Sequence, residues 1–320
     1  MYERIERIKK RVIVDHYPIC IEKYRITADV LEESRHDPAM VQRGKMLKAY
    51  AERMPIAIAD DELIVGLGAS KPMGLEIDPN YGIWTQDEID SLIEDGYEMS
   101  RQDQMDLQEL NRHHDPATQI GMQGDIFYEQ EDERILKLLK AGLILPPWKD
   151  KAQGRGVGGG YAQSGLGLGP SLVLLMVDYS KILADRYSAL AAQMAEKETD
   201  PVRRAELTVI SETCAWIPRN KPRTFREAIQ CFWFQFLMLS PSTTLPGGRF
   251  DQYMYPFYEA DLNAGRITCE EAVELLCCMR LKDMELNRTS GKNNRKKNAG
   301  HEQRMMTNPP CRAPDPPLHT

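Results

Sequence analysis

The chain has 320 residues, of which 42% are hydrophobic and 28% are charged, a composition typical of a globular protein with a sizeable core and about two domains. Its net charge of -7 gives no support to a nucleic-acid-binding role, and no uncharged apolar run approaches the ~20 residues of a membrane helix. The charged start MYERIERIKKR lacks the apolar stretch of a secretion signal, so we expect a cytoplasmic protein.

The first hundred residues are predicted to be mainly helical. Apolar side chains recur there at three- and four-residue spacing in three segments, residues 2–14, 18–33 and 38–53. The run PIAIADDELIVG at 55–66 has β-branched and apolar pieces around an acidic turn, which predicts a strand or hairpin. Thr85 and Glu88 form the T-x-x-E pattern of a capping box, so a helix is predicted over 86–95.

The middle of the chain has weaker patterns. Residues 100–129 are polar and show no clear periodicity, so we predict no regular element for them. Within this stretch, His113 and His114 are interpreted as solvated loop residues, because partner ligands for a metal are not evident. A further helix is predicted over 131–141, where the following ILPPW ends it.

Residues 153–170 contain eight glycines in eighteen positions, which excludes the interior of a regular element. Because glycines leave the backbone amides accessible, the segment suggests a phosphate-binding loop. Asp178 follows at the sequence spacing expected of an acidic residue that binds a ribose. However, the segment has no G-K-[ST] and no helix in the required place. A packed irregular loop near a cavity is the favoured interpretation.

The second half returns to strong helical signals. A short buried run and four helices are predicted over residues 171–177, 179–197, 201–216, 225–239 and 269–286. Pro201 after Asp200 fits the first helical position. Thr224 with Glu227, like the T-C-E-E run at 268–271, has the spacing of a capping box.

The seven cysteines indicate a reducing compartment, because they form an odd set without C-x-x-C or His at metal-ligand spacing. We therefore expect no disulfide framework and no metal site. Cys277 and Cys278 are adjacent, and such a pair has the chemistry to pass a radical or exchange disulfides. Their apolar surroundings favour the other interpretation, two small buried side chains in a helix.

The segment PGGRFDQYMYPFYEADLNAGRIT joins two of the predicted helices and is rich in aromatic residues. Arg249 and Asp251 flank a phenylalanine in it. Charges in such a setting need partners, either each other or neighbouring groups. We interpret the pair as a structural latch beside a pocket.

Several blocks in order resemble the glycyl radical enzymes, the pyruvate formate-lyase-like family. The blocks are ICIEKYRITADVLEES, RGKMLKAYAERMPIAIADDELIVG, VDYSKIL, RTFREAIQCFWF, GGRFDQYMYPFYEADLNAGRIT and EEAVELL. Within the family, LKDMELNRTSGKNNRKKNAGH looks most similar to the branch of the arylacetate and 4-hydroxyphenylacetate decarboxylases. Leu174 stands near the place of a Gly-His pair found in many diol dehydratases, which favours an apolar or aromatic substrate.

The resemblance implies a mainly α fold with some β structure, comprising an N-terminal helical portion and the first half of a ten-stranded α/β barrel. It also implies a glycyl radical, installed by a radical-SAM activating enzyme, that generates a thiyl radical on a cysteine inside the barrel. A small aromatic carboxylate would then lose carbon dioxide. A closed interior keeps radicals from water and oxygen.

The substrate wall is the part of the site that the resemblance assigns to this chain. Ser242, Thr243 and Thr244 correspond to positions with hydroxyl contacts to substrate, although a turn capping the preceding helix explains them equally well. Phe232, Trp233 and Phe234 are candidates to line an aromatic cavity, although packing of a core helix explains them at least as well. No catalytic residue is assigned.

The 320 residues lack the family's Gly-Cys-x-Glu segment and its R-V-x-G-[FY] radical loop. We therefore expect residues 1–300 to be the N-terminal part of the family domain, 301–320 to be an unrelated, disordered tail, and the isolated chain to be inactive. A truncated or frame-shifted gene end would explain this, and the protein would then be poorly soluble or depend on another chain. A homo-oligomer is also considered. The alternatives are a radical dehydratase, a formate acetyltransferase-like enzyme, or a non-catalytic helical scaffold.

Overall fold

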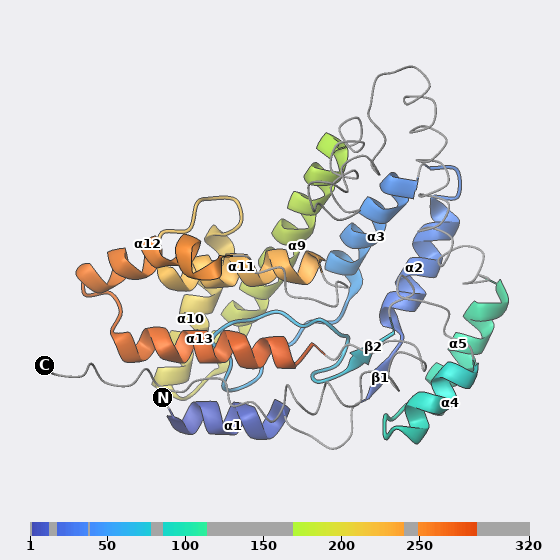
Figure 1. The fold of residues 1–320 in the computed structure, drawn as a ribbon, viewed down its shortest axis with the longest axis horizontal. Helices are drawn as coiled ribbons and strands as arrows, with labels where there is room; N and C mark the ends of the chain where they lie inside the picture. Colours follow the sequence, from blue (N-terminus) through green and yellow to red (C-terminus); the bar gives the residue numbers. More distant parts are fainter. Residues whose placement is uncertain are drawn as a thin grey trace, which may run out of the picture.

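The computed structural model describes residues 2–12, 18–37, 39–77, 86–113, 169–239 and 249–286 (Figure 1). Their helices and strands are α1 (Tyr2–Val12), β1 (Ile19–Cys20), α2 (Glu22–Glu33), α3 (Ala39–Arg53), β2 (Leu75–Glu76), α4 (Gln86–Glu94), α5 (Arg101–His113), α9 (Gly169–Lys197), α10 (Pro201–Trp216), α11 (Phe225–Leu239), α12 (Phe250–Asn263) and α13 (Cys269–Met284). The helix predicted at 131–141, most of the glycine-rich segment and the boundary at residue 300 lie outside the described residues.

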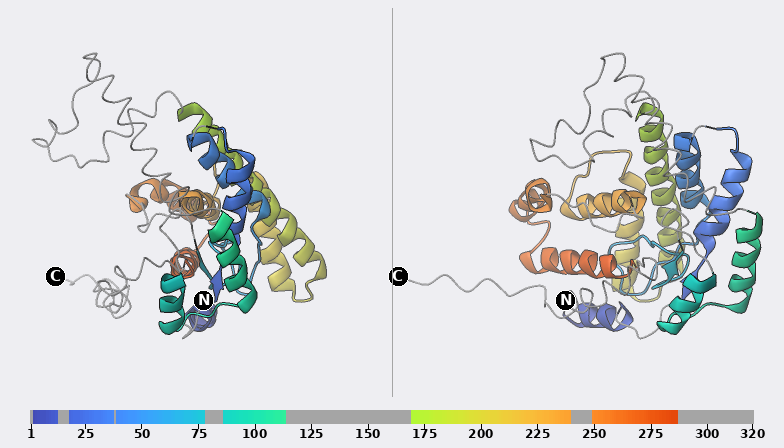
Figure 2. Two further views of the ribbon diagram at one scale, coloured as in Figure 1. Left: turned by 90° about the vertical axis from the view of Figure 1, so that its right-hand side faces the viewer. Right: turned by 45° about the vertical axis from the view of Figure 1, so that its right-hand side comes forward.

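Five helices lie side by side in a row. In this row α10 contacts α9, α9 contacts α3, α3 contacts α2, and α2 contacts α5. Helices α11, α12 and α13 lie on one side of the row, as the turned views in Figure 2 show. Because α11 contacts α9 and α13 contacts α1, helices distant in sequence form one packed body. No helix in the described ranges is both long and apolar enough to cross a bilayer.

Two groups of buried side chains hold this arrangement together. The main core draws on α1–α3 and α9–α13, and Tyr187, Trp233 and Phe234 are among its largest fully buried members. A smaller core, which includes Leu107, joins the strands to α2, α4 and α5. Burial of apolar surface on this scale is the main force favouring the folded chain.

The sheet in the described residues has two short parallel strands. Ile19 pairs with Leu75 and Cys20 with Glu76. The mainly helical character with some β structure is therefore as predicted. The first half of a ten-stranded barrel is not seen in these segments, and that part of the fold remains a prediction.

The strand or hairpin predicted at residues 55–66 is wrong, because this segment has no strand in the structure. Side chains from distant helices take the place of strand partners, and they bond backbone groups of this segment and of Leu67, which follows it. These bonds join Gln230 to the amide and carbonyl of Val65 (2.8 and 2.7 Å), Trp233 to Gly66 (3.1 Å), Tyr187 to Leu67 (2.9 Å), and Arg203 to Ala59 and Glu62 (2.8 and 2.9 Å). The apolar pattern therefore reports burial, while the bonding partners lie far away in sequence.

The prediction of no regular element in residues 100–129 is also wrong in part, because α5 covers Arg101–His113. Leu107 is its one fully buried hydrophobic side chain within the described part. Ser100 accepts a bond from the Asp103 amide (3.0 Å), and Arg25 of α2 pairs with Asp103 (2.9 Å). Capping and charge pairing thus support a helix that has almost no apolar periodicity.

The predicted run at 171–177 and helix at 179–197 form one continuous helix, α9. The capping box of Thr268 and Glu271 is confirmed at the start of α13. At the start of α11, Thr224 accepts the bond from the Glu227 amide (3.2 Å), as predicted. However, the Glu227 carboxylate bonds the Arg223 amide (2.6 Å).

Asp200 caps α10 and offers a direct test of these helix-start signals. Its carboxylate accepts bonds from the amides of Val202 (3.1 Å) and Arg203 (3.3 Å), with Pro201 at the first turn. Asp200→Ala is expected to lower the free energy of unfolding by about 1 kcal/mol. Urea unfolding followed by circular dichroism measures the loss, and Thr199→Ala, one position outside the cap, should change it much less.

Candidate functional site

Trp233 and Phe232 lie on different sides of α11, because neighbouring residues of a helix point about 100° apart. The Trp233 side chain is fully buried, and its indole Nε1 donates a hydrogen bond to the carbonyl of Gly66 at 3.1 Å. Its ring centroid lies 5.5 Å from that of Phe236. Trp233 therefore packs in the core and holds the 55–66 segment, and its role in a substrate cavity remains a prediction.

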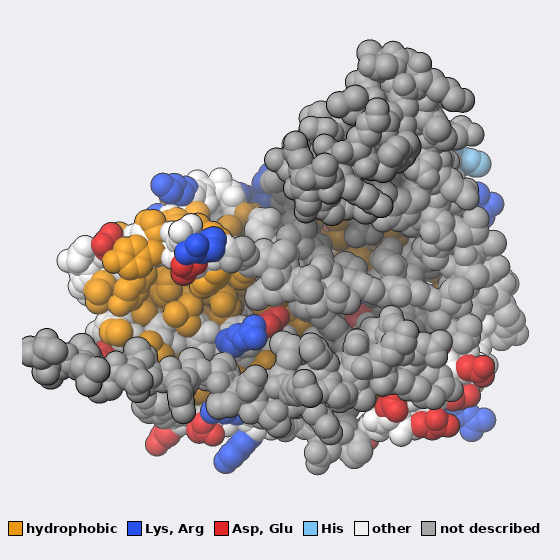
Figure 3. All heavy atoms as spheres, viewed as in Figure 1, with side chains coloured by type: hydrophobic (Ala, Val, Ile, Leu, Met, Phe, Trp, Pro, Cys, Tyr) orange, Lys and Arg blue, Asp and Glu red, His pale blue; other side chains and the backbone are white. Residues whose placement is uncertain are grey.

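Phe232 belongs to an aromatic cluster between α11 and α12, which we call the Phe232 cluster: Phe232, Phe236, Phe250 and Tyr253. The Phe232 ring lies 5.1 Å from Phe250 in an edge-to-face arrangement and 6.3 Å from Tyr253. It stacks on Phe236 at 6.4 Å. Phe232 is partly buried, whereas Tyr253 is exposed. Hydrophobic side chains are visible over these two helices in Figure 3.

Arg249 and Asp251 satisfy each other at the start of α12. The guanidinium donates to both carboxylate oxygens, at 3.2 and 2.9 Å. This bond holds the pKa of the Asp251 carboxyl below its usual range. Both side chains are about 70% exposed, so the pair contributes little to stability as it stands. Its role as a latch beside a pocket stays a prediction.

Ser242, Thr243 and Thr244 lie outside the described residues. In the sequence they fall between the end of α11 at Leu239 and Arg249. The two helices that this segment joins both contribute to the Phe232 cluster. The predicted hydroxyl contacts therefore remain a prediction at positions close in sequence to an aromatic surface.

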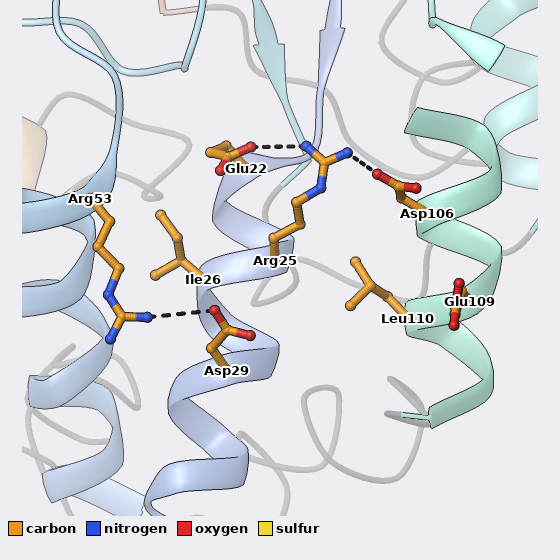
Figure 4. A pocket seen from close by; sticks show the side chains of 8 residues that line it. All are labelled: Glu22, Arg25, Ile26, Asp29, Arg53, Asp106, Glu109 and Leu110. Atoms are coloured by element: carbon orange, nitrogen blue, oxygen red, sulfur yellow. Dashed lines mark hydrogen bonds and ion pairs between the residues drawn. The ribbon is translucent and has the colours of Figure 1, made fainter. Parts of the chain in front are cut away.

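A polar pocket that sequence reasoning missed lies between α2, α3 and α5. Its volume is about 540 Å³, and Glu22, Arg25, Ile26, Asp29, Arg53, Asp106, Glu109 and Leu110 line it (Figure 4). Arg25 pairs with Glu22 (2.9 Å) and with Asp106, and Arg53 pairs with Asp29 (3.5 Å). Arg25 joins α2 to α5 through Asp106, and Arg53 joins α3 to α2 through Asp29, so both guanidinium charges are paired. Within the described ranges, no cluster of three or more His, Cys, Asp or Glu side chains is arranged to bind a metal ion.

A buried charge network was also missed, although Lys282 and Glu285 stand three residues apart in the sequence. The Lys282 Nζ lies 2.5 Å from Glu62 Oε1 and 2.7 Å from Glu285 Oε2. Arg11 approaches Glu285 at 3.4 Å. Burial alone lowers the pKa of the Lys282 ammonium, but the two carboxylates outweigh burial and raise it. The network ties α1, α13 and the 55–66 segment together.

The match to a known protein family identifies the family of this chain. The family described as "Pyruvate formate lyase-like" matches residues 1–166 and 172–308. The chain belongs to this family. Its members are the glycyl radical enzymes, which are enzymes of the lyase and dehydratase type, so the resemblance seen in the sequence is confirmed.

Particular relatives of this pyruvate formate lyase-like chain differ in the reaction they are named for. Isethionate sulfite-lyase of Oleidesulfovibrio alaskensis is 28% identical over 82% of the chain and 36% of its own length. Indoleacetate decarboxylase of Tractidigestivibacter scatoligenes is 37% identical over 31% of the chain and 12% of its own length. In fold, the chain matches the glycerol dehydratase of Clostridium butyricum with a TM-score of 0.72, at 24% identity, over 92% of this chain and 41% of that one.

The pyruvate formate lyase-like chain thus spans less than half the length of these relatives. Its described cysteines form no disulfide bonds, and Cys278 is buried in α13. Burial raises the pKa of the Cys278 thiol to about 12, so the thiol is neutral at physiological pH and unsuited to act as a nucleophile. The favoured interpretation, a packed helix cysteine, agrees with its position in the core.

Proposed function

We propose that this chain is the N-terminal, substrate-side part of a glycyl radical lyase that releases a small stable fragment from an organic acid. The observation that carries the proposal is the family match over nearly all of residues 1–308. The 320 residues contain neither Gly-Cys-x-Glu nor R-V-x-G-[FY]. This supports a separation of the substrate wall from the residues that carry the radical. The chain supplies the wall, and other residues supply the cysteine and the glycine.

Elimination of a leaving group, such as sulfite or water, is the favoured reaction, because relatives named for each of these reactions match more than four fifths of the chain. The relationship to isethionate sulfite-lyase extends over 82% of the chain, much further than the relationship to the decarboxylase. In such a reaction the substrate radical loses a heteroatom group from the neighbouring carbon. The protein would need to orient the substrate and exclude water while the radical exists.

Decarboxylation of an aryl- or hydroxyarylacetate is the second candidate. It is supported by the 37% identity to indoleacetate decarboxylase over 102 residues and by the aromatic side chains of the Phe232 cluster. Aromatic rings pack favourably on other rings in edge-to-face and offset geometry. Ser242, Thr243 and Thr244 would donate hydrogen bonds to the acidic group of the substrate, which is a sulfonate in the first reaction and a carboxylate in the second.

Anaerobic activation provides the test. Treated alone with a radical-SAM activating enzyme, the chain is expected to give no glycyl radical doublet in its EPR spectrum. The matched control is full-length isethionate sulfite-lyase of Oleidesulfovibrio alaskensis, activated in parallel, which must give the doublet. A doublet from the isolated chain would overturn the proposed separation of the wall from the radical.

The substrate is tested with a complemented enzyme, in which this chain is mixed with the part of a relative that it lacks. We would add the part of the Oleidesulfovibrio enzyme that lies beyond the matched region, activate the mixture, and measure sulfite from isethionate and carbon dioxide from indoleacetate and 4-hydroxyphenylacetate. Sulfite release is the expected result. Carbon dioxide release without sulfite would replace elimination by decarboxylation, and a doublet with neither product would refute both.

A further inference from the structure

Two arginine side chains have a buried guanidinium nitrogen without a hydrogen-bond partner. These atoms are Nη1 of Arg4, which belongs to α1, and Nη1 of Arg226, which belongs to α11. A buried donor that is left unpaired destabilises a folded protein, and the penalty is larger when the donor belongs to a charged group. Such atoms are therefore expected to bind a water molecule or an ion.

The two guanidinium groups share the same neighbours. Arg4 pairs with Glu206 of α10, and it also pairs with Glu274 of α13 at 3.4 Å. Burial lowers the pKa of the Arg226 guanidinium, and the charges of these two carboxylates oppose burial without offsetting it. The charge of Arg4 lowers the same pKa. The two arginines are therefore close enough to repel each other.

Four helices bring these side chains together. Helix α13 lies between α1 and α11 and contacts both, and α10 contacts α11 (Figure 1). We call this group of side chains the Arg4–Arg226 site: Arg4, Arg203, Glu206, Arg226 and Glu274. Arg4, Glu206 and Glu274 are each only 17–18% exposed, so water screens these charges weakly.

The Arg4–Arg226 site has one more positive charge than negative charges, because three arginines face two carboxylates. Glu206 is shared between two of the arginines, since it pairs with Arg203 at 2.8 Å and with Arg4. No ion pair of Arg226 is formed within the described part of the chain. Arg226 is therefore a largely buried cation without a counter-ion of its own, which is unfavourable in a protein interior.

The other ionisable groups nearby do not supply the missing negative charge. The Cys278 thiol is neutral, because burial raises its pKa to about 12. Asp61, whose carboxyl also senses the charge of Arg4, already pairs with Arg7 at 2.7 Å. The unbalanced charge at Arg226 therefore remains.

We propose that the Arg4–Arg226 site binds one small monovalent anion of the size of chloride, which accepts a hydrogen bond from Nη1 of each arginine. A water molecule satisfies the two donors but leaves the extra positive charge unbalanced. An anion satisfies both requirements, and its hydrogen bonds are charge-assisted and therefore stronger. The bound anion joins α1 to α11 and stabilises the folded chain.

Thermal unfolding of the full chain tests the proposal, with chloride replacing gluconate stepwise at constant ionic strength. Gluconate is too large for a buried site of this kind, and constant ionic strength keeps general screening unchanged. A ligand that binds only the folded chain multiplies the ratio of folded to unfolded molecules by 1 + [L]/Kd, which is about elevenfold at ten times Kd. The expected result is a saturable rise of Tm with chloride, and a constant Tm would overturn the proposal.

Arg226→Lys separates a specific site from a general salt effect, because lysine keeps the positive charge but lacks the second guanidinium nitrogen. It should raise the Kd for chloride about tenfold or more, by loss of a charge-assisted bond. The matched control is Arg219→Lys, because Arg219 is 42% exposed and pairs with Asp185 at 2.6 Å. The control should keep the wild-type Kd. Equal Kd values for both variants would overturn the proposal.

Crystals of the wild-type chain grown in bromide provide a readout that needs no variant, because bromide replaces chloride and scatters anomalously. An anomalous peak within hydrogen-bond distance of Nη1 of both Arg4 and Arg226 is the expected result. A water molecule at this position, or a peak without any saturable stabilisation in solution, would overturn the proposal. None of these outcomes depends on the proposed lyase activity.

Discussion

Replacing Lys282 by methionine is expected to lower the free energy of unfolding by about 3–5 kcal/mol. The ammonium is 3% exposed and lies between the carboxylates of Glu62 and Glu285, at 2.5 and 2.7 Å. Methionine has a similar length but no charge, so the variant leaves two buried carboxylates facing each other. Glu62 Oε2 already has no hydrogen-bond partner, and Arg11, which lies 3.4 Å from Glu285 and 3.9 Å from Glu62, offsets only part of the loss because these contacts are longer than those of Lys282.

The matched control is Arg280→Met on the same helix. Arg280 pairs with Asp283 at 2.8 Å but is 52% exposed, and exposed pairs contribute at most about 1 kcal/mol. Urea unfolding of both variants at one pH measures the difference. If Lys282→Met costs no more than Arg280→Met, the buried network does not have the importance assigned to it.

The effect of Lys282→Met should also depend on pH. Burial raises the pKa of the Glu62 carboxyl, and the charge of Lys282 opposes that rise. Without the ammonium the pKa moves higher still. An acid whose pKa is higher in the folded chain binds more protons when folded, so stability falls as pH rises above the ordinary value of 4.5. The loss should therefore be smaller near pH 5 than near pH 7.

Trp233→Ala is expected to destabilise the chain by about 3–5 kcal/mol, because it leaves a cavity in the main core. The same change removes the hydrogen bond from Nε1 to Gly66 and frees one end of the 55–66 segment. Gly66 has φ +131°, and a Cβ there would lie 2.7 Å from Leu237 and 2.9 Å from the indole nitrogen. The indole and this backbone are therefore closely fitted.

Trp216→Ala is the control for Trp233→Ala. Trp216 has the same side chain but is partly exposed, and it stacks on Arg223 at 3.9 Å. Thermal and urea unfolding should show a clearly smaller loss for Trp216→Ala. In the complemented enzyme, a near-normal stability of Trp233→Ala together with a raised KM would contradict the structural role and support the predicted contact with substrate.

Local signals in the sequence were sufficient for most helices. The starts of α10 and α13 follow from Asp200, Pro201 and the Thr268–Glu271 capping box, because a cap acts on amides one turn away. The ordered blocks from residue 19 to about 280 also identified the family, which the family match confirms. The same evidence did not determine the reaction, because relatives named for sulfite release, dehydration and decarboxylation all match the chain.

Tertiary contacts decided the rest. The apolar run at 55–66 shows that the segment is buried, but Arg203 and Gln230, more than 140 residues away, replace a strand as its partners. Likewise, Lys282 has the sequence of a solvated helix residue until Glu62 comes within 2.5 Å. Periodicity records which side chains leave water, whereas the identity of a long-range hydrogen-bond or charge partner depends on how the helices pack.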